Sequence, residues 1–263
     1  MKTSWFSRLS FPFLVTALFT VPIVAAQTQG ASPQGANARA APSQLSAAFS
    51  GGKVVQQVQL SGDAKWYAGS TQDSGTANLI ASADGSSQMQ LALGALGQKT
   101  ETQTGSGSSA ICQWAGADGV AHAISADNCW KPVLWFLPAL SLQPSLLPSN
   151  LGIVDLGTST VGSSTNVYRH LQSQLVFSGL PDMMTNDIMK QSTTDLGLDP
   201  ETLLPAVLAY SVRPDNGAPV TITIEVHYSD YRVVNGVQIP FLIQRYVNGS
   251  LQLEVSISSA EIN

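Results

Sequence analysis

Hydrophobic and polar residues alternate strictly over two runs in the C-terminal third of the chain, residues 220–229 and 251–258. Apolar residues stand at every second position from Val220 to Tyr228, with polar residues between them. A period of two predicts a β-strand with one buried face. Asn235-Gly236 and Asn248-Gly249 separate this run from two more, residues 237–247 and 251–258, and Asn-Gly supplies the positive φ angles of a tight hairpin. The pattern predicts an antiparallel meander of three long strands.

Shorter alternating runs precede this meander. Asp84-Gly85 and Asp118-Gly119 are typical of the turns that separate such runs, and residues 183–189 predict a short helical turn. Together with less regular apolar stretches, the pattern predicts about eight to eleven strands. The remaining strands are expected at residues 57–60, 76–81, 88–93, 110–114, 167–177 and 202–212.

An antiparallel sheet with one dry face must cover that face. Residues 128–147 are apolar and rich in aromatic side chains, and they are the expected cover. Pro132 is placed to open a helix there, and Pro138 to end or kink it. The predicted fold is mainly β with a few helices: a curved antiparallel sheet, or incomplete barrel, with a helical or loop plug on its concave face.

The N-terminus has the features of a secretory signal peptide. Lys2 and Arg8 precede an apolar stretch, and Val24-Ala25-Ala26 supplies small residues before a cleavage site at residue 26. The apolar stretch is too short for a membrane anchor, since a spanning helix needs about 20 apolar residues. Three segments follow: a signal peptide (1–26), a disordered linker rich in Ala, Gln, Ser, Gly and Pro (27–44), and one β-rich domain (45–263) without a transmembrane segment.

The charge balance and the cysteine content limit the partners and the covalent bonds that the chain can have. The chain has 12 basic against 17 acidic residues, which argues against a nucleic-acid partner. Cys112 and Cys129 are its two cysteines, and in an exported protein such a pair predicts a disulfide. The alternative, a metal or redox pair, lacks a CxxC spacing and a neighbouring histidine.

No catalytic motif is visible, so an enzyme is not expected, and neither is a cofactor or a metal. The nucleophile elbow, the HExxH helix and the phosphate-binding glycine loop are all absent. His170 and His227 fall on the polar side of strand patterns, where surface or cross-strand roles are expected. His122 follows a turn inside the expected disulfide loop and is the histidine least easily assigned a structural role.

Several phrases resemble a family of uncharacterised proteins secreted by soil-type bacteria, among them residues 114–122, 135–139, 228–240 and 246–251. The phrase at residues 228–240 is also similar to one in LolA-like and LolB-like envelope carriers. That second resemblance implies a curved half-barrel whose concave side is plugged and holds acyl chains. It is an analogy of fold, and folds of this kind host many functions.

Two functions remain open for an exported protein of the periplasm or the exterior. One is a carrier of an acyl chain or another hydrophobic ligand; the other is a structural or protein-interaction module of the envelope without a small-molecule ligand. The carrier hypothesis places aromatic plug residues beside a cavity and sheet residues at its floor, whereas the module hypothesis has the plug filling the sheet. The expected cavity residues are Trp130, Trp135, Phe136, Ile224, Phe241 and Val255.

Overall fold

The structure is a computed structural model that describes residues 34–106, 109–131, 133–214, 218 and 220–263. Residues 33–263 form one compact unit. The expected signal peptide and residues 27–33 of the expected linker lie outside the described residues, as does Pro132.

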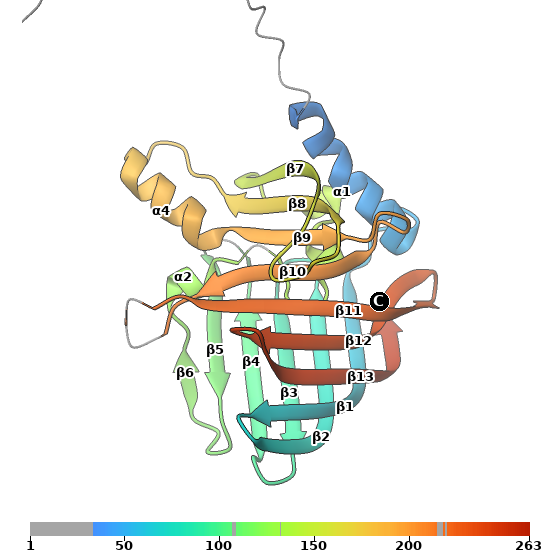
Figure 1. Ribbon diagram of the computed structural model, residues 1–263, viewed down its shortest axis with the longest axis vertical. Helices are drawn as coiled ribbons and strands as arrows, with labels where there is room; N and C mark the ends of the chain where they lie inside the picture. Colours follow the sequence, from blue (N-terminus) through green and yellow to red (C-terminus); the bar gives the residue numbers. More distant parts are fainter. Residues whose placement is uncertain (1–33, 107–108, 132, 215–217, 219) are drawn as a thin grey trace, which may run out of the picture. The chain divides into compact units, whose positions relative to one another are not determined.

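The described strands form a single antiparallel sheet of 13 strands in the order β6-β5-β4-β3-β2-β1-β13-β12-β11-β10-β9-β8-β7 (Figure 1). The sheet is not closed, because β6 and β7 stand at its two ends. The mainly β prediction is confirmed, with more strands than expected. The strands are β1 (Gln57–Ala68), β2 (Thr71–Ser82), β3 (Ser87–Leu93), β4 (Gln98–Thr104), β5 (Ile111–Ala115), β6 (Ala121–Ala123), β7 (Leu151–Ser159), β8 (Tyr168–Leu175), β9 (Thr194–Leu198), β10 (Pro205–Val212), β11 (Ile222–Val234), β12 (Val237–Val247) and β13 (Ser250–Ile262).

The predicted C-terminal meander is confirmed. β11 pairs with β12 and β12 with β13, all antiparallel. Asn235 and Gly236 have φ angles of 52° and 84°, and Asn248 and Gly249 of 49° and 77°. The two Asn-Gly turns therefore adopt the left-handed backbone that makes their hairpins tight.

Two glycines sit inside the long strands β1 and β2. A Cβ on Gly62 would lie 2.1 Å from the Ser256 carbonyl oxygen, and one on Gly75 would lie 1.8 Å from the Ala92 carbonyl oxygen. The β1–β13 register also shifts at Gly62. Glycines and bulges of this kind let strands bend sharply, and Figure 1 shows the strands on either side of this region running across one another.

The residues that follow β6 cover the inner side of the bent sheet. α2 (Ala126–Cys129) and α3 (Pro138–Ser141) flank a non-helical stretch, and η2 (Pro144–Leu146) follows. α3 contacts both β2 and β10, so it lies between the two halves of the sheet. Leu134, Phe136 and Leu140 are at most 4% exposed. Residues 130–147, the plug, therefore cover the dry face as predicted, but Pro138 begins a helical turn instead of ending one.

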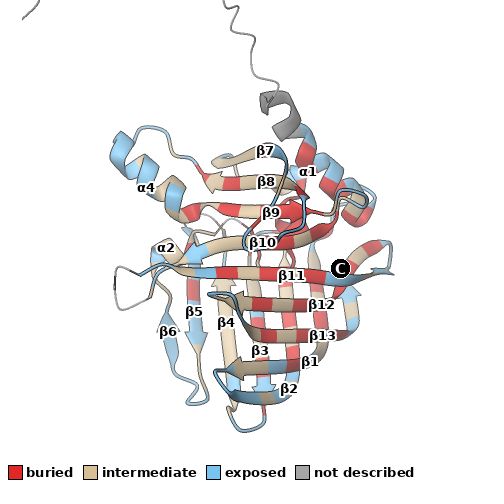
Figure 2. Ribbon diagram, viewed as in Figure 1, coloured by how far each residue is buried: buried red, intermediate tan, exposed pale blue. Residues whose placement is uncertain are grey.

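Helix α1 (Gln34–Ser50) was not predicted. The sequence analysis placed residues up to 44 in a disordered linker, and this is wrong for residues 34–44. Ala41, Leu45 and Phe49 recur every four residues and are at most 1% exposed (Figure 2). Tertiary packing of this narrow stripe overrides the Ala- and Ser-rich composition and Pro42 inside the helix. The domain therefore begins at α1. The last helix, α4 (Asp182–Ser192), extends the predicted helical turn.

Candidate functional site

A cavity of about 420 Å³ lies between the plug and the two halves of the sheet. Its walls come from β1, β3, β4 and β5 on one side and from β10, β11, β12 and β13 on the other. Three of the five tryptophans in the sequence line it. The aromatic and apolar lining residues are Trp66, Met89, Trp114, Ile124, Val133, Leu134, Trp135, Phe136, Tyr210, Val212, Pro214, Ile222, Ile224 and Val247.

Polar side chains fix the plug at three points. Before the plug, Asn128 of α2 donates to the Arg213 carbonyl at 2.6 Å and accepts from the Arg213 N–H at 2.8 Å. In its middle, the Tyr228 hydroxyl donates to the Trp135 carbonyl. At its far end, buried Gln143 donates to the Val55 carbonyl at 2.9 Å and accepts from the Val55 N–H at 2.8 Å. The plug is thus held by side chains that pair with backbone groups, of which those of Val55 are buried.

The predicted disulfide is present between Cys112 and Cys129. Their Cα atoms are 5.7 Å apart and they are separated by 17 positions in the chain. It joins strand β5 to the last residue of α2, one residue before the plug. Cys112 also lines the cavity, so the bond fixes the plug to the wall at this point.

A charged residue occupies the apolar wall. Arg245 of β12 is 6% exposed and lines the cavity. Its Nη1 lies 3.1 and 3.0 Å from the two carboxylate oxygens of Glu101 on β4. The centroids of the Trp135 and Trp66 rings lie 4.7 and 5.9 Å from its guanidinium carbon. Burial alone would lower the pKa of Arg245, but the Glu101 carboxylate raises it above its usual value.

Lys131 and Arg213 lie at another part of the lining, where a smaller cavity of about 280 Å³ adjoins the first. Burial lowers the pKa of Lys131 to about 8, and nearby Arg213 acts in the same direction while Asp127 opposes it. The Lys131 ammonium donates to the Gln191 carbonyl. Above about pH 8, Lys131 is therefore mostly uncharged, and Arg213 supplies the positive charge at this end of the cavity.

The structure brings together three of the six expected cavity residues. Trp135, Phe136 and Ile224 line the cavity. Trp130 is the C-cap residue that follows α2, and it is not in the lining. Phe241 is inward-facing but covered by Arg232, whose guanidinium carbon lies 4.3 Å from its ring centroid. Val255 is fully buried in the core.

The sequence analysis missed Arg245 and Glu101. A signal for Arg245 was present: it shares the inward parity of Ile239, Phe241 and Ile243 on β12, so it is a charge on a dry face. Glu101 gave no such signal, because β4 is polar throughout. Its inward orientation follows only from its pairing opposite buried Met89.

A serine, a histidine and an aspartate form a line across β7, β8 and β9. The Ser159 hydroxyl lies 2.8 Å from Nδ1 of His170, and Nε2 of His170 lies 2.8 Å from the Asp195 carboxylate. Hydrogen bonds from His170 and Gln172 lower the pKa of Asp195, although burial alone would raise it. Asp195 lines the smaller cavity, but Ser159 and His170 line neither one, so the serine hydroxyl does not face a described cavity. The three residues form a cross-strand network of the kind expected for His170.

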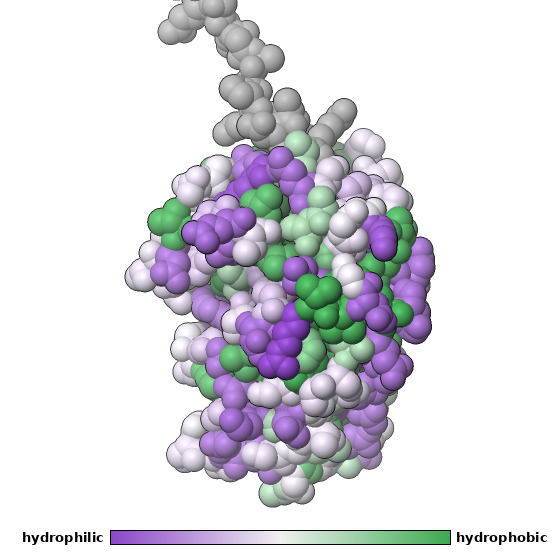
Figure 3. All heavy atoms as spheres, turned by 90° about the vertical axis from the view of Figure 1, so that its right-hand side faces the viewer, coloured by the Kyte–Doolittle hydropathy of each residue, from purple (hydrophilic) through white to green (hydrophobic). Residues whose placement is uncertain are grey.

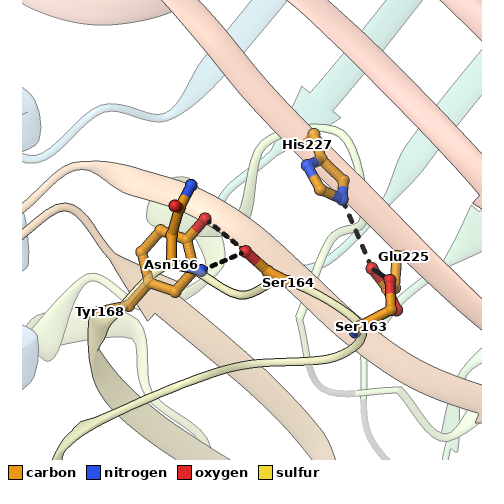
Figure 4. A network of polar contacts seen from close by, with 6 residues as sticks. All are labelled: Ser163, Ser164, Asn166, Tyr168, Glu225 and His227. Carbon is orange, nitrogen blue, oxygen red and sulfur yellow. Dashed lines mark hydrogen bonds and ion pairs between the residues drawn. The ribbon is translucent and has the colours of Figure 1, made fainter.

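Figure 4 shows a second network, which ties the loop after β7 to β11. The Ser163 hydroxyl and N–H both donate to Glu225, at 2.9 and 2.6 Å. His227 contacts the same carboxylate at 3.4 Å, so the serine binds the acid and not the imidazole. The arrangement fastens the loop and does not activate a nucleophile. The third histidine, His122, is exposed and stacks on the Trp114 ring at 4.4 Å.

The surface also carries apolar side chains. Figure 3 shows a face on which hydrophobic residues gather among polar ones. On α4, Met183 and Met184 are 76% and 50% exposed, and neither lines a described cavity. Within the described part of the chain, no helix has the length and apolarity to cross a membrane, and no group of three or more metal-ligating side chains occurs.

No family model and no curated protein matches the sequence, but solved structures match its fold. One is a domain described as an outer membrane lipoprotein-sorting protein, from Vibrio parahaemolyticus, with a TM-score of 0.53 at 8% identity over 87% of this chain and 93% of that one. A LolA superfamily protein from Nitrosomonas europaea gives 0.51 at 8% identity, covering 86% of this chain and 93% of its own.

A DUF1329 family protein from Desulfovibrio piger gives a TM-score of 0.52 at 10% identity, over 86% of this chain and 93% of that one. Likenesses at such low identity establish the fold and nothing finer. The chain has the LolA-like fold that its C-terminal phrase led us to expect.

Proposed function

We propose that this chain is an exported envelope protein that binds a hydrophobic, acyl-bearing ligand in the cavity beneath its sheet and carries it. The observation behind this proposal is the cavity of about 420 Å³ that lies beside the main cluster of buried hydrophobic residues. Its size falls within the range of ligand pockets, roughly 300–1,000 Å³. Its lining combines an aromatic and aliphatic part with polar and charged side chains, among them Glu101, Lys131 and Arg245. A ligand in this space would remove the apolar part of the lining from contact with water, which favours binding.

Fold and compartment support the same function. One neighbour of similar fold is described as a lipoprotein-sorting protein, and another belongs to the LolA superfamily. The signal-like N-terminus and the disulfide favour an oxidising compartment, periplasmic or extracellular. The alternative, a ligand-free interaction module, predicts a filled core, and the cavity argues against it. A non-enzymatic role fits these neighbours.

Bromine quenching of tryptophan fluorescence tests the proposal, because Trp66, Trp114 and Trp135 line the cavity. We expect dibromostearoyl glycerol, an ester with a brominated acyl chain, to quench the fluorescence saturably at one site per chain. Native mass spectrometry of protein purified from its own envelope should show a bound lipid. If brominated acyl compounds with and without polar ends all fail to quench, the carrier proposal is wrong.

Variants that fill part of the cavity test whether the acyl chain of the ligand lies there. Ile224→Phe and Val247→Phe enlarge two lining residues, while Leu156→Phe enlarges an exposed residue of β7 as the matched control. If the new ring excludes two methylenes, the affinity falls roughly tenfold, at about 0.8 kcal/mol per methylene. The control should bind like the parent protein. Unchanged binding in both lining variants would place the ligand elsewhere.

A further inference from the structure

The guanidinium of Arg245 is only partly used by the protein. Nη1 holds both contacts with Glu101. Nε is buried and has no hydrogen-bond partner among the residues that the structure describes. A buried N–H without an acceptor is uncommon in folded proteins and costs about 1–3 kcal/mol.

The unused donor coincides with the cavity, which is an independent observation. Arg245 is 6% exposed and belongs to the lining. The rings of Trp135 and Trp66 lie close to its guanidinium. Contacts with ring faces leave hydrogen bonding to the in-plane N–H groups of an arginine. A ligand in the cavity with an acceptor atom in that plane would satisfy Nε.

The charges of Arg245 and Glu101 determine which kind of ligand atom can accept a hydrogen bond from Nε. Glu101 already neutralises Arg245, so a second carboxylate at the same guanidinium would repel the first. A carbonyl oxygen supplies the acceptor without this repulsion. Lys131 and Arg213 also line this cavity, at the part that adjoins the smaller one and where Asp127 lies beside them. Neither is among the charged groups that shift the pKa of Arg245, so the acceptor at Nε is selected by the Arg245–Glu101 pair.

Building on the proposed carrier function, we propose that Arg245 recognises a neutral acyl carbonyl, as in an ester or amide, and that the cavity takes acyl esters or amides in preference to free fatty acids. The acyl chain lies among the aromatic and aliphatic lining, and the carbonyl oxygen accepts from Nε of Arg245. Trp66 and Trp135 orient the guanidinium, and Glu101 compensates its charge.

Three brominated probes with the same hydrocarbon chain separate the contributions of the chain, the carbonyl acceptor and the carboxylate charge to binding. They are dibromostearoyl glycerol (neutral ester), dibromostearate (free acid) and dibromooctadecane (no acceptor). The parent protein should bind the ester about tenfold more tightly than the alkane, since a hydrogen bond from a charged donor contributes about 1.5 kcal/mol or more. At neutral pH the free acid should bind more weakly than the ester.

Arg245→Lys keeps a cation for Glu101 but removes the Nε–H group. It should lose about tenfold in ester affinity and leave alkane affinity unchanged. The matched control is Arg232→Lys, because this exposed arginine lies over Phe241 and not in the cavity. It should change neither the ester affinity nor the alkane affinity. Glu101→Gln removes the compensating charge and should reverse the preference towards the free acid. It also provides a second test if Arg245→Lys does not fold.

The outcomes separate the two proposals. Equal binding of ester and alkane by the parent protein overturns the carbonyl proposal and leaves the carrier function standing. Tighter binding of the free acid than of the ester by the parent protein also overturns the carbonyl proposal. A Glu101→Gln variant that still prefers the ester overturns it as well. Failure of all three probes to quench refutes the carrier function itself.

Discussion

Removing the disulfide should destabilise the domain by an amount set by the loop that it closes. Cys112 and Cys129 are 17 positions apart. In the chain-entropy account, closing a loop of about 15 residues lowers the free energy of folding by about 3 kcal/mol, because the cross-link restricts the unfolded chain. For a domain of this size each kcal/mol moves the unfolding midpoint by about 2–4 °C. We therefore expect a fall of about 6–12 °C.

The assay is thermal unfolding followed by circular dichroism, for the parent protein and for Cys112→Ser/Cys129→Ser, each with and without reductant. The sequence has only these two cysteines, so reductant should lower the midpoint of the parent and leave the double variant unchanged. A shift below about 2 °C in both comparisons would refute the entropic argument. It would mean that residues 112–129 are restrained equally well without the bond, for instance by the two hydrogen bonds between Asn128 and Arg213.

Three further substitutions test how the plug and the outer strands are held. With the pKa of Lys131 lowered to about 8 from 10.5, the unfolded chain binds more protons between these values. The unfolding free energy should therefore rise with pH in that window, by at most roughly 1.4 kcal/mol per unit, and Lys131→Met should abolish the slope. Gln143→Ala should cost about 2–3 kcal/mol in urea unfolding, because both backbone groups of Val55 lose their partner. Asp195→Asn should cost about 1–2 kcal/mol at neutral pH and flatten the acid limb of the pH–stability curve, since the lowered pKa of Asp195 gives stability that is lost as pH falls through it.

The sequence predicted the elements whose structure depends on residues close together in the chain, such as tight turns and alternating strands. The Asn-Gly turns need positive φ angles, which few residues adopt, and β11 and β13 alternate regularly, so the meander was predictable. The apolar density of residues 130–147 likewise marked the plug, although the position of its helical turns was not predictable from prolines.

Elements that depend on distant partners were not predictable. Strand β4 is polar throughout and exists because β3 and β5 pair with its two edges. Helix α1 has a single narrow apolar stripe, and its helical form depends on packing against the rest of the domain. The same holds for the site: Trp66, Glu101 and Arg245 come from three strands, and only the bend of the sheet brings them to one cavity.

The composition of this cavity argues for a ligand more strongly than its volume does. The Arg245 side chain is 8% exposed and that of Glu101 32%, so only the arginine is desolvated. Placing a charge in such a position is costly, and an apolar residue would fill the sheet as well. Leaving Nε without an acceptor adds a further cost. The apolar part of the lining and the unused donor lie at the same place, and one occupant with an apolar chain and a neutral acceptor would cover the first and satisfy the second. A protein-interaction module would need no buried arginine with an unused donor beside an apolar lining.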